Sequence, residues 1–180
     1  MHTLTPELIF RARTLIRDVP NFPKPGITFK DITPVLSDPD AMRQVIDRLL
    51  AFANRQHPDV IIGIESRGFV MGMPLALELA LPFVPVRKIG KLPYNTIQEN
   101  YNLEYGTNTL EVHSDAIQRG QRVLIVDDLL ATGGTASATI KLAERLGGVV
   151  CGLAFMVELS FLNGRDALQG YETHSLIQFE

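Results

Sequence analysis

Short apolar runs separated by helical patterns constrain the fold of this chain more than any other feature. They occupy residues 59–65 (DVIIGIE), 123–126 (VLIV) and 149–159 (VVCGLAFMVEL). Runs of this length that are rich in branched residues predict strands covered on both faces. Helical patterns follow the first two runs, at residues 67–80 and 135–148. Because alternating strands and helices form right-handed βαβ units, we expect an α/β fold with a mostly parallel, twisted sheet flanked by helices.

The remaining segments complete this outline. Thr5-Pro6 and Asp38-Pro39 are typical helix starts, and a proline-rich connector between those helices is too punctuated for a long element. Residues 82–88 predict a further strand and residues 175–179 an edge strand, whereas the polar stretch from Gly90 to Thr109 predicts an irregular loop. With 180 residues and no internal repeat, we expect a single domain over residues 1–180.

Composition narrows the class of protein. Hydrophobic residues make up 46% of the chain, charged residues 21%, and the formal net charge is −3, so we expect neither a nucleic-acid nor a membrane partner. The lone Cys151 fits a reducing compartment. The early charges of the N-terminal segment predict no signal peptide, and prolines interrupt the apolar stretch 69–86. We therefore expect a soluble cytoplasmic protein.

The second predicted strand–helix junction carries the strongest chemical signal. The strand VLIV runs into Asp127 and Asp128, and the turn ATGGT (131–135) then opens a helix. Backbone N–H groups at a helix start bind phosphate, glycines allow close approach, and threonine hydroxyls add donors. The turn comprises Ala131, Thr132, Gly133, Gly134 and Thr135. It lacks the Gly-Lys-Ser/Thr ending of a Walker loop, and G-x-G-x-x-G is absent from the chain.

The two acids refine the predicted ligand. Carboxylates repel phosphate but accept strong hydrogen bonds from sugar hydroxyls. A phosphate turn beside Asp127 and Asp128 therefore indicates a ribose 5-phosphate, with both acids at the ribose. The alternative is structural: one Asp would cap the following helix and the other would be solvated.

The segment VLIVDDLLATGGTA resembles the phosphoribosyl-diphosphate (PRPP) signature of the type I phosphoribosyltransferases. FPKPGITFKDITPVL, GIESRGF, VRKIGKLP and LEYGTNTLEV resemble segments of the adenine-specific members in the same order, from about Asn21 to Arg165. The resemblance implies a small N-terminal base-recognition hood (about 1–36) and a mobile catalytic lid (about 90–110). It also implies transfer of the 5-phosphoribosyl group from PRPP to N9 of adenine, giving AMP and pyrophosphate.

The resemblance also implies a pyrophosphate site in which a cis peptide often precedes the serine. Its residues would be Ser66, Arg67, Arg87, Lys88, Lys91 and Tyr105. Two structural alternatives stay open: Arg67 could simply pair with Glu65, and the basic residues after Val86 could form a solvated edge.

The lid and the base site complete the implied machinery. Glu104 would assist deprotonation at adenine N9 as a general base, alongside the catalytic acids Asp127 and Asp128. Adenine-binding candidates are Thr28, Phe29, Lys30 and Leu159. Phe29 and Leu159 would pack on the two ring faces, and the backbone near Lys30 would read the base edge. Plain core packing and a surface loop carboxylate are the respective alternatives.

Cofactor and partners follow from the same resemblance. Mg²⁺ is expected, held mainly by substrate and water, because the four histidines are scattered and no dedicated metal-ligand cluster is visible. A homodimer is implied by resemblance only. Two other functions remain: phosphoribosyl transfer to another base such as guanine, xanthine or orotate, and a non-catalytic purine or PRPP sensor.

Overall fold

The computed structural model describes residues 10–103 and 106–180. The chain divides into two compact units, residues 1–48 and 49–180, which are described in turn. The helix start predicted at Thr5-Pro6 lies outside the described residues.

The N-terminal unit is built from short elements, as its prolines predict. The elements are α1 (Arg11–Leu15), β1 (Arg17–Pro20), β2 (Thr28–Asp31), α2 (Thr33–Leu36) and the first part of α3 (Pro39–Gln56). The proline-rich connector holds a feature that the sequence did not predict: β1 and β2 form an antiparallel hairpin. The Asp38 carboxylate accepts a hydrogen bond from the Ala41 N–H (2.9 Å), consistent with the predicted start of α3.

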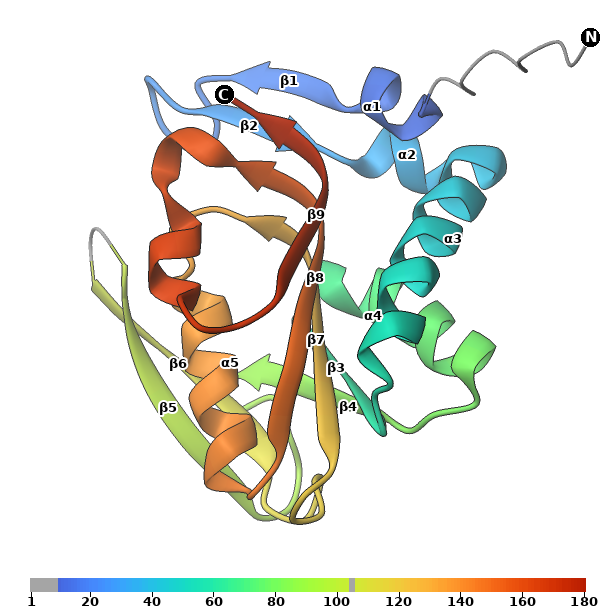
Figure 1. The fold of residues 1–180 in the computed structure, drawn as a ribbon. Helices are drawn as coiled ribbons and strands as arrows, with labels where there is room; N and C mark the ends of the chain where they lie inside the picture. The colour runs from blue at the N-terminus through green and yellow to red at the C-terminus, as the bar shows by residue number, and fades with distance from the viewer. Residues whose placement is uncertain (1–9, 104–105) are drawn as a thin grey trace, which may run out of the picture. The chain divides into compact units, whose positions relative to one another are not determined.

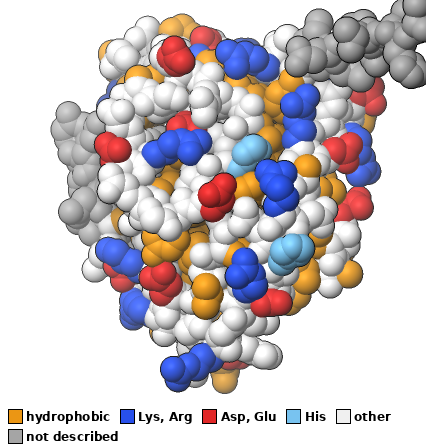
Figure 2. Space-filling view, in the orientation of Figure 1, with side chains coloured by type: hydrophobic (Ala, Val, Ile, Leu, Met, Phe, Trp, Pro, Cys, Tyr) orange, Lys and Arg blue, Asp and Glu red, His pale blue; other side chains and the backbone are white. Residues whose placement is uncertain are grey.

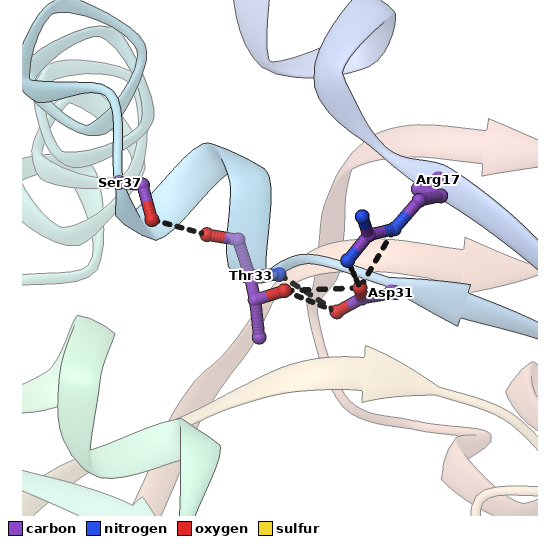
Figure 3. A network of polar contacts seen from close by, with 4 residues as sticks. All are labelled: Arg17, Asp31, Thr33 and Ser37. Atoms are coloured by element: carbon purple, nitrogen blue, oxygen red, sulfur yellow. Dashed lines mark hydrogen bonds and ion pairs between the residues drawn. The ribbon is translucent and has the colours of Figure 1, made fainter.

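An ion-pair network fixes the end of this hairpin (Figure 3). Asp31 Oδ2 accepts hydrogen bonds from Nε and Nη2 of Arg17 at 3.1 and 2.6 Å, and Asp31 Oδ1 accepts one from the Thr33 N–H at 2.9 Å. The Thr33 N–H, the Arg17 guanidinium and the Thr33 hydroxyl lower the pKa of Asp31 to about 2. Ser37 Oγ in turn donates to the Thr33 carbonyl (3.1 Å). The network therefore links β1, β2 and α2.

The C-terminal unit is organised around a seven-stranded sheet in the order β5-β6-β4-β3-β7-β8-β9 (Figure 1). Its strands are β3 (Val60–Ile64), β4 (Phe83–Lys88), β5 (Thr96–Leu103), β6 (Gly106–His113), β7 (Arg122–Leu130), β8 (Val149–Leu159) and β9 (Thr173–Phe179). Strands β4, β3, β7, β8 and β9 pair in parallel, and β5 and β6 add an antiparallel edge. The predicted α/β class, mostly parallel sheet and edge strand β9 are confirmed.

Helices cover this sheet on both faces. The chain steps through α4 (Arg67–Leu79) from β3 to β4, and through α5 (Gly134–Arg145) from β7 to β8. These steps run in opposite directions along the sheet, so right-handed crossovers place α4 and α5 on opposite faces (Figure 1). On the α5 face, Val60, Ile62 and Ile64 of β3 join the buried apolar core at two-residue spacing.

The polar stretch from Gly90 to Thr109 is mostly strand, so the predicted irregular loop is wrong there. Its strands β5 and β6 form an antiparallel hairpin in the register Thr96↔His113 to Leu103↔Gly106. Ile97 and Tyr101 pack against the core, whereas Gln98 and Asn100 are exposed. An antiparallel edge with one solvated face is polar enough to resemble a loop.

Helix α5 packs against this hairpin (Figure 1). Arg145 Nη1 donates to the Gln98 carbonyl (2.6 Å) and to Glu99 Oε2 (3.1 Å), and Lys141 Nζ lies 3.3 Å from Glu99 Oε1. The β5–β6 hairpin is therefore held along one side by the helix that follows the acid pair.

The exposed surface mixes both signs of charge. On the face shown in Figure 2, basic and acidic side chains are interspersed with hydrophobic ones rather than gathered by sign. Within the described residues, no helix combines the length and the hydrophobicity needed to cross a membrane.

Candidate active site

One edge of the sheet collects most of the predicted site residues. Because β3, β4, β7 and β8 run in parallel, the segments after their carboxyl ends emerge at the same edge. These segments are residues 65–67 after β3, 89–91 after β4, 131–135 after β7 and 160–168 after β8. The acid pair, the glycine turn and the basic residues therefore meet there, although Arg67 and Thr135 are 68 positions apart in sequence.

A small hollow lies at the end of β7. Strand β7 continues through the acid pair to Leu130, beyond the apolar run, and Asp127 lies opposite Phe155 of β8. The hollow has a volume of about 60 Å³. Its lining residues are Asp127, Leu129, Leu130, Ala131, Thr132, Gly133, Gly134, Thr135, Ala136 and Phe155. It therefore joins one carboxylate to the complete predicted phosphate turn.

The turn leads into α5, as predicted. Gly133 is the N-cap residue with φ +82°, a left-handed conformation that favours glycine, and the Ser137 N–H donates to its carbonyl (2.9 Å). The N–H groups of the first helical residues, Gly134 to Ala136, have no partner within the helix, and they carry the positive end of its dipole. This end of α5 suits a phosphate group.

The acids have different surroundings. Asp128 is 4% exposed, and its Oδ2 lies 3.0 Å from Nε of Arg67 at the start of α4. Among the described residues that buried oxygen accepts no well-aligned hydrogen bond. Asp127 is half-buried, and its Oδ1 accepts the Asp128 N–H (2.9 Å). The alternative of a helix cap and a solvated acid is wrong, because Gly133 caps α5 and Asp128 is buried.

Burial governs the protonation of this pair. Desolvation, followed by the charge of Asp128, raises the pKa of Asp127 well above its usual range. Desolvation also raises the pKa of Asp128, although the Arg67 guanidinium opposes that effect. The Arg67 guanidinium thus forms a salt bridge with Asp128, and a ligand hydroxyl would supply the hydrogen bond that the buried Asp128 oxygen lacks among the described residues.

The segments after β3 and β4 form a second polar group. A cis peptide joins Glu65 to Ser66, as the resemblance implied. Glu65 Oε2 accepts hydrogen bonds from Arg87 Nε (3.2 Å) and from the Lys88 N–H (3.0 Å). Burial of Glu65 opposes ionisation, but these donors outweigh it and lower the pKa of Glu65. The salt bridge of Glu65 is thus with Arg87, whereas that of Arg67 is with Asp128.

Lys91 is tied to the same region through its backbone. Arg87 Nη1 donates to the Lys91 carbonyl (3.0 Å), and the Lys91 N–H donates to Oε1 of Glu111 (2.9 Å), which is 3% exposed. The ammonium groups of Lys88 and Lys91 belong to exposed residues. The structure therefore brings Ser66, Arg67, Arg87 and the 88–91 segment to one edge of the sheet.

The base-site candidates lie in both units. Thr28 is exposed on β2, and Phe29 meets Phe22 edge-on with ring centroids 5.2 Å apart. Lys30 Nζ pairs with Asp18 Oδ1 (2.6 Å) across the hairpin. Leu159 is buried at the end of β8. Glu104 and Tyr105 lie outside the described residues, so their roles stay predictions.

Comparison with known proteins decides the family. Residues 36–165 match the model of the phosphoribosyl transferase domain. The chain belongs to the phosphoribosyltransferase family. A curated relative from Desulfitobacterium hafniense, named adenine phosphoribosyltransferase, is 56% identical over 164 residues, which is 91% of this chain and 95% of the relative.

Solved structures agree with this phosphoribosyltransferase assignment. The adenine phosphoribosyltransferase of Thermoanaerobacter pseudethanolicus superposes with a TM-score of 0.92 at 53% identity, covering 94% of this chain and 98% of that one. The Saccharomyces cerevisiae enzyme, solved with adenine and an imino-altritol bisphosphate, gives a TM-score of 0.88 at 38% identity over 92% and 96% of the two chains. The resemblance to adenine phosphoribosyltransferases is thereby confirmed.

Sequence reasoning missed the acids that support this phosphoribosyltransferase site. Glu65 holds Arg87 and the Lys88 backbone, and Glu111 holds the backbone at Lys91 and Leu92. One signal was present, because Glu111 stands between two apolar residues, Leu110 and Val112, that are both buried. A buried acid in such a strand needs partners, and here the partners are backbone N–H groups near the basic residues.

Proposed function

We propose that this phosphoribosyltransferase transfers the 5-phosphoribosyl group of PRPP to N9 of adenine and releases AMP and pyrophosphate. The observation that carries the proposal is the hollow in which Asp127 and the turn 131–135 line one small space. It offers amides to a phosphate and a carboxylate to a sugar at one place. The close relatives named adenine phosphoribosyltransferase support adenine as the acceptor.

Each end of PRPP has its own set of groups in this proposal. Residues Ala131 to Thr135 hold the 5′-phosphate with backbone N–H groups and threonine hydroxyls. Asp127 and Asp128 accept hydrogen bonds from the ribose hydroxyls. The pyrophosphate is bound by Ser66, Arg67, Arg87, Lys88, Lys91 and Tyr105. Binding PRPP would draw Arg67 toward the pyrophosphate and give the buried Asp128 a hydroxyl partner instead.

The chemistry at C1′ needs charge stabilisation and exclusion of water. As the bond from C1′ to pyrophosphate breaks, positive charge builds on the ribosyl ring, and the nearby carboxylates stabilise it. Basic residues at the end of β4 stabilise the leaving pyrophosphate. Adenine N9 forms the new bond to C1′ while Glu104 accepts the N9 proton as a general base. In the sequence Glu104 lies between the residues of β5 and those of β6, and in this proposal that segment acts as the lid.

Mg²⁺ fits the groups available at this site. Among the described residues, no three acid, histidine or cysteine side chains gather as a metal cluster. Mg²⁺ is commonly bound by one or two carboxylates together with substrate phosphates and water. In our proposal Asp127 and Asp128 are the carboxylates that face the metal–substrate complex. When bound, the ion neutralises charge on the pyrophosphate.

The N-terminal unit provides base recognition in this proposal. The backbone of Thr28 to Lys30 offers a C=O and N–H pair to the adenine edge, and Phe29 and Leu159 pack on the ring. The Lys30 ammonium already pairs with Asp18, which favours a backbone rather than a side-chain role for Lys30. A 6-oxopurine would leave buried donors or acceptors unpaired and would be rejected.

We also propose a cytoplasmic homodimer. Exposed apolar side chains on α4 support the dimer: Val70, Met73 and Leu77 are 39%, 45% and 71% exposed. Their spacing of three and four residues places them on one stripe of the helix. An apolar stripe that stays exposed in one chain suits burial against a second copy. The lone Cys151 agrees with a reducing compartment.

Direct detection of AMP tests the activity. The purified protein is incubated with adenine, PRPP and Mg²⁺, and AMP and pyrophosphate are quantified. Parallel reactions contain guanine, hypoxanthine, xanthine or orotate. Fastest turnover with adenine supports the proposal, and faster turnover with any other base overturns the choice of acceptor. PRPP binding without product from any base would indicate a sensor.

A further inference from the structure

A turn after β8 backs the phosphate loop. Helix η2 (Gly164–Leu168) lies very close to residues 131–133. Neither Gly133 nor Gly164 has room for a methyl group. A Cβ built on Gly133 would lie 2.4 Å from the Gly164 carbonyl oxygen and 2.9 Å from Cβ of Ala167. A Cβ on Gly164 would lie 2.2 Å from the Ala131 carbonyl oxygen. The position of the loop therefore depends on the position of η2.

Arg165 fixes η2 to the sheet. Its Nε and Nη2 donate to the two carboxylate oxygens of Glu158 at 2.8 Å each, and its Nη1 donates to the Thr173 carbonyl at 3.0 Å. Glu158 and Thr173 belong to β8 and β9. A planar guanidinium bonded on three sides sets both the distance and the orientation of the segment that carries it.

The Glu158–Arg165 pair is largely shielded from water on the acid side. Glu158 is 5% exposed, and Gln178 Nε2 also approaches its Oε2 (3.4 Å). Arg165 is the main reason that the pKa of Glu158 lies below its usual range, and Glu158 raises the pKa of Arg165. Removing Arg165 would leave the buried Glu158 carboxylate without its counter-charge, which is more disruptive than losing a surface pair.

Neither residue belongs to the machinery described above. Glu158 and Arg165 do not line the hollow, whereas Gly133 and Ala131, which contact η2, do. We infer that Glu158 and Arg165 are positioning residues: their bidentate pair holds η2 against the phosphate loop and so sets the affinity for the 5′-phosphate of PRPP. This inference rests on the proposed function and extends it to residues outside the site.

Three substitutions test the inference: Arg165→Met, Arg165→Lys and Glu158→Gln. A matched control is Arg122→Met, because Arg122 also donates to backbone carbonyls, of Gln56 and His57, but at the opposite end of β7. KM for PRPP, KM for adenine and kcat are measured for each variant. Binding of ribose 5-phosphate is measured by calorimetry, which needs no turnover, and thermal unfolding monitors the fold.

We expect Arg165→Met to raise KM for PRPP and Kd for ribose 5-phosphate about tenfold, because a small displacement of contacting groups is costly in an oriented site. KM for adenine should change less than threefold. Arg165→Lys keeps the positive charge but loses the two-pronged guanidinium contact with Glu158. Its KM for PRPP and its Kd for ribose 5-phosphate should lie between those of Arg165→Met and the parent. Arg122→Met should lose stability with KM for PRPP unchanged.

The pair also predicts coupling. If the two side chains act as one brace, adding Glu158→Gln to Arg165→Met should change Kd for ribose 5-phosphate by less than twofold. Unchanged Kd in folded Arg165→Lys and Glu158→Gln proteins would overturn the inference even if Arg165→Met does not fold. So would equal rises in KM for both substrates. A parent protein that binds ribose 5-phosphate but makes no AMP would instead count against the proposed activity.

Discussion

Nε of Arg67 lies 3.0 Å from Oδ2 of Asp128. A residue predicted to bind pyrophosphate and a residue predicted to bind ribose therefore form an ion pair in this structure. The pair joins the first turn of α4 to the end of β7, and its two residues are 61 positions apart in the sequence. It keeps a guanidinium and a buried carboxylate in place at the sheet edge. In the proposed function, PRPP bound at this edge replaces that contact with its own contacts to the two side chains.

Neutralising either acid should impair use of PRPP. We expect Asp127→Asn and Asp128→Asn to lower kcat/KM for PRPP by about a hundredfold or more, because the developing positive charge loses a carboxylate. Circular dichroism should show an unchanged fold. The exposed Asp115→Asn is the matched control and should keep the parent activity. Near-normal kcat/KM in both acid variants would refute the ribose role.

The Asp127 carboxylate should destabilise the fold at neutral pH. The pKa of Asp127 is raised in the folded state, so folding favours its protonated form. Its stabilising contribution is complete below the unfolded pKa of about 4 and is lost as pH rises toward the folded pKa. Asp127→Asn should therefore raise the free energy of unfolding at pH 7, and the gain should shrink as pH falls toward 4. Urea unfolding at both pH values measures it, and a pH-independent difference would contradict the cause.

The Asp31 carboxylate in the N-terminal unit should affect stability in the opposite direction: its ionised form should stabilise the fold at neutral pH. Its pKa is lowered to about 2, so its stabilising contribution is present above the unfolded pKa of about 4 and is lost as pH falls from 4 toward 2. Asp31→Asn should lower the Tm at pH 7, and the deficit should shrink at pH 3. Asp40→Asn, in the first turn of α3, is the comparison. A deficit that is equal at both pH values would mean that ionisation is not responsible.

The exposed stripe on α4 gives a test of assembly. Met73→Glu and Leu77→Glu place a charge at the proposed interface, and we expect each to shift sedimentation from dimer to monomer at micromolar concentration. Val149→Glu is the control, because Val149 is a comparably exposed apolar residue (51%) on β8. Dimers that persist in both α4 variants would place the interface elsewhere.

Local pattern in the sequence was enough to predict the α/β class, the strands of the sheet centre and the turn that opens α5. These features depend on neighbours along the chain: continuous apolar runs predict buried strands, and ATGGT predicts an amide-rich helix start. The prediction failed for the polar stretch 90–109, where polar residues belong to strands that pack in the sheet. The β5–β6 hairpin is polar on one face. Its strand pairing and the salt bridge from Arg145 of α5 to Glu99 hold it at the edge of the sheet.

What only the tertiary structure decided is which charges are partners. The sequence left Arg67 with Glu65 as an alternative, but the parallel strands bring Asp128 to Arg67 and Arg87 to Glu65. Similarly, nothing in the local sequence connects Arg165 with the phosphate turn, because that connection passes through Gly164 in space. Hydrophobic periodicity is local and can be read from the chain, whereas an ion pair depends on two distant segments reaching the same edge.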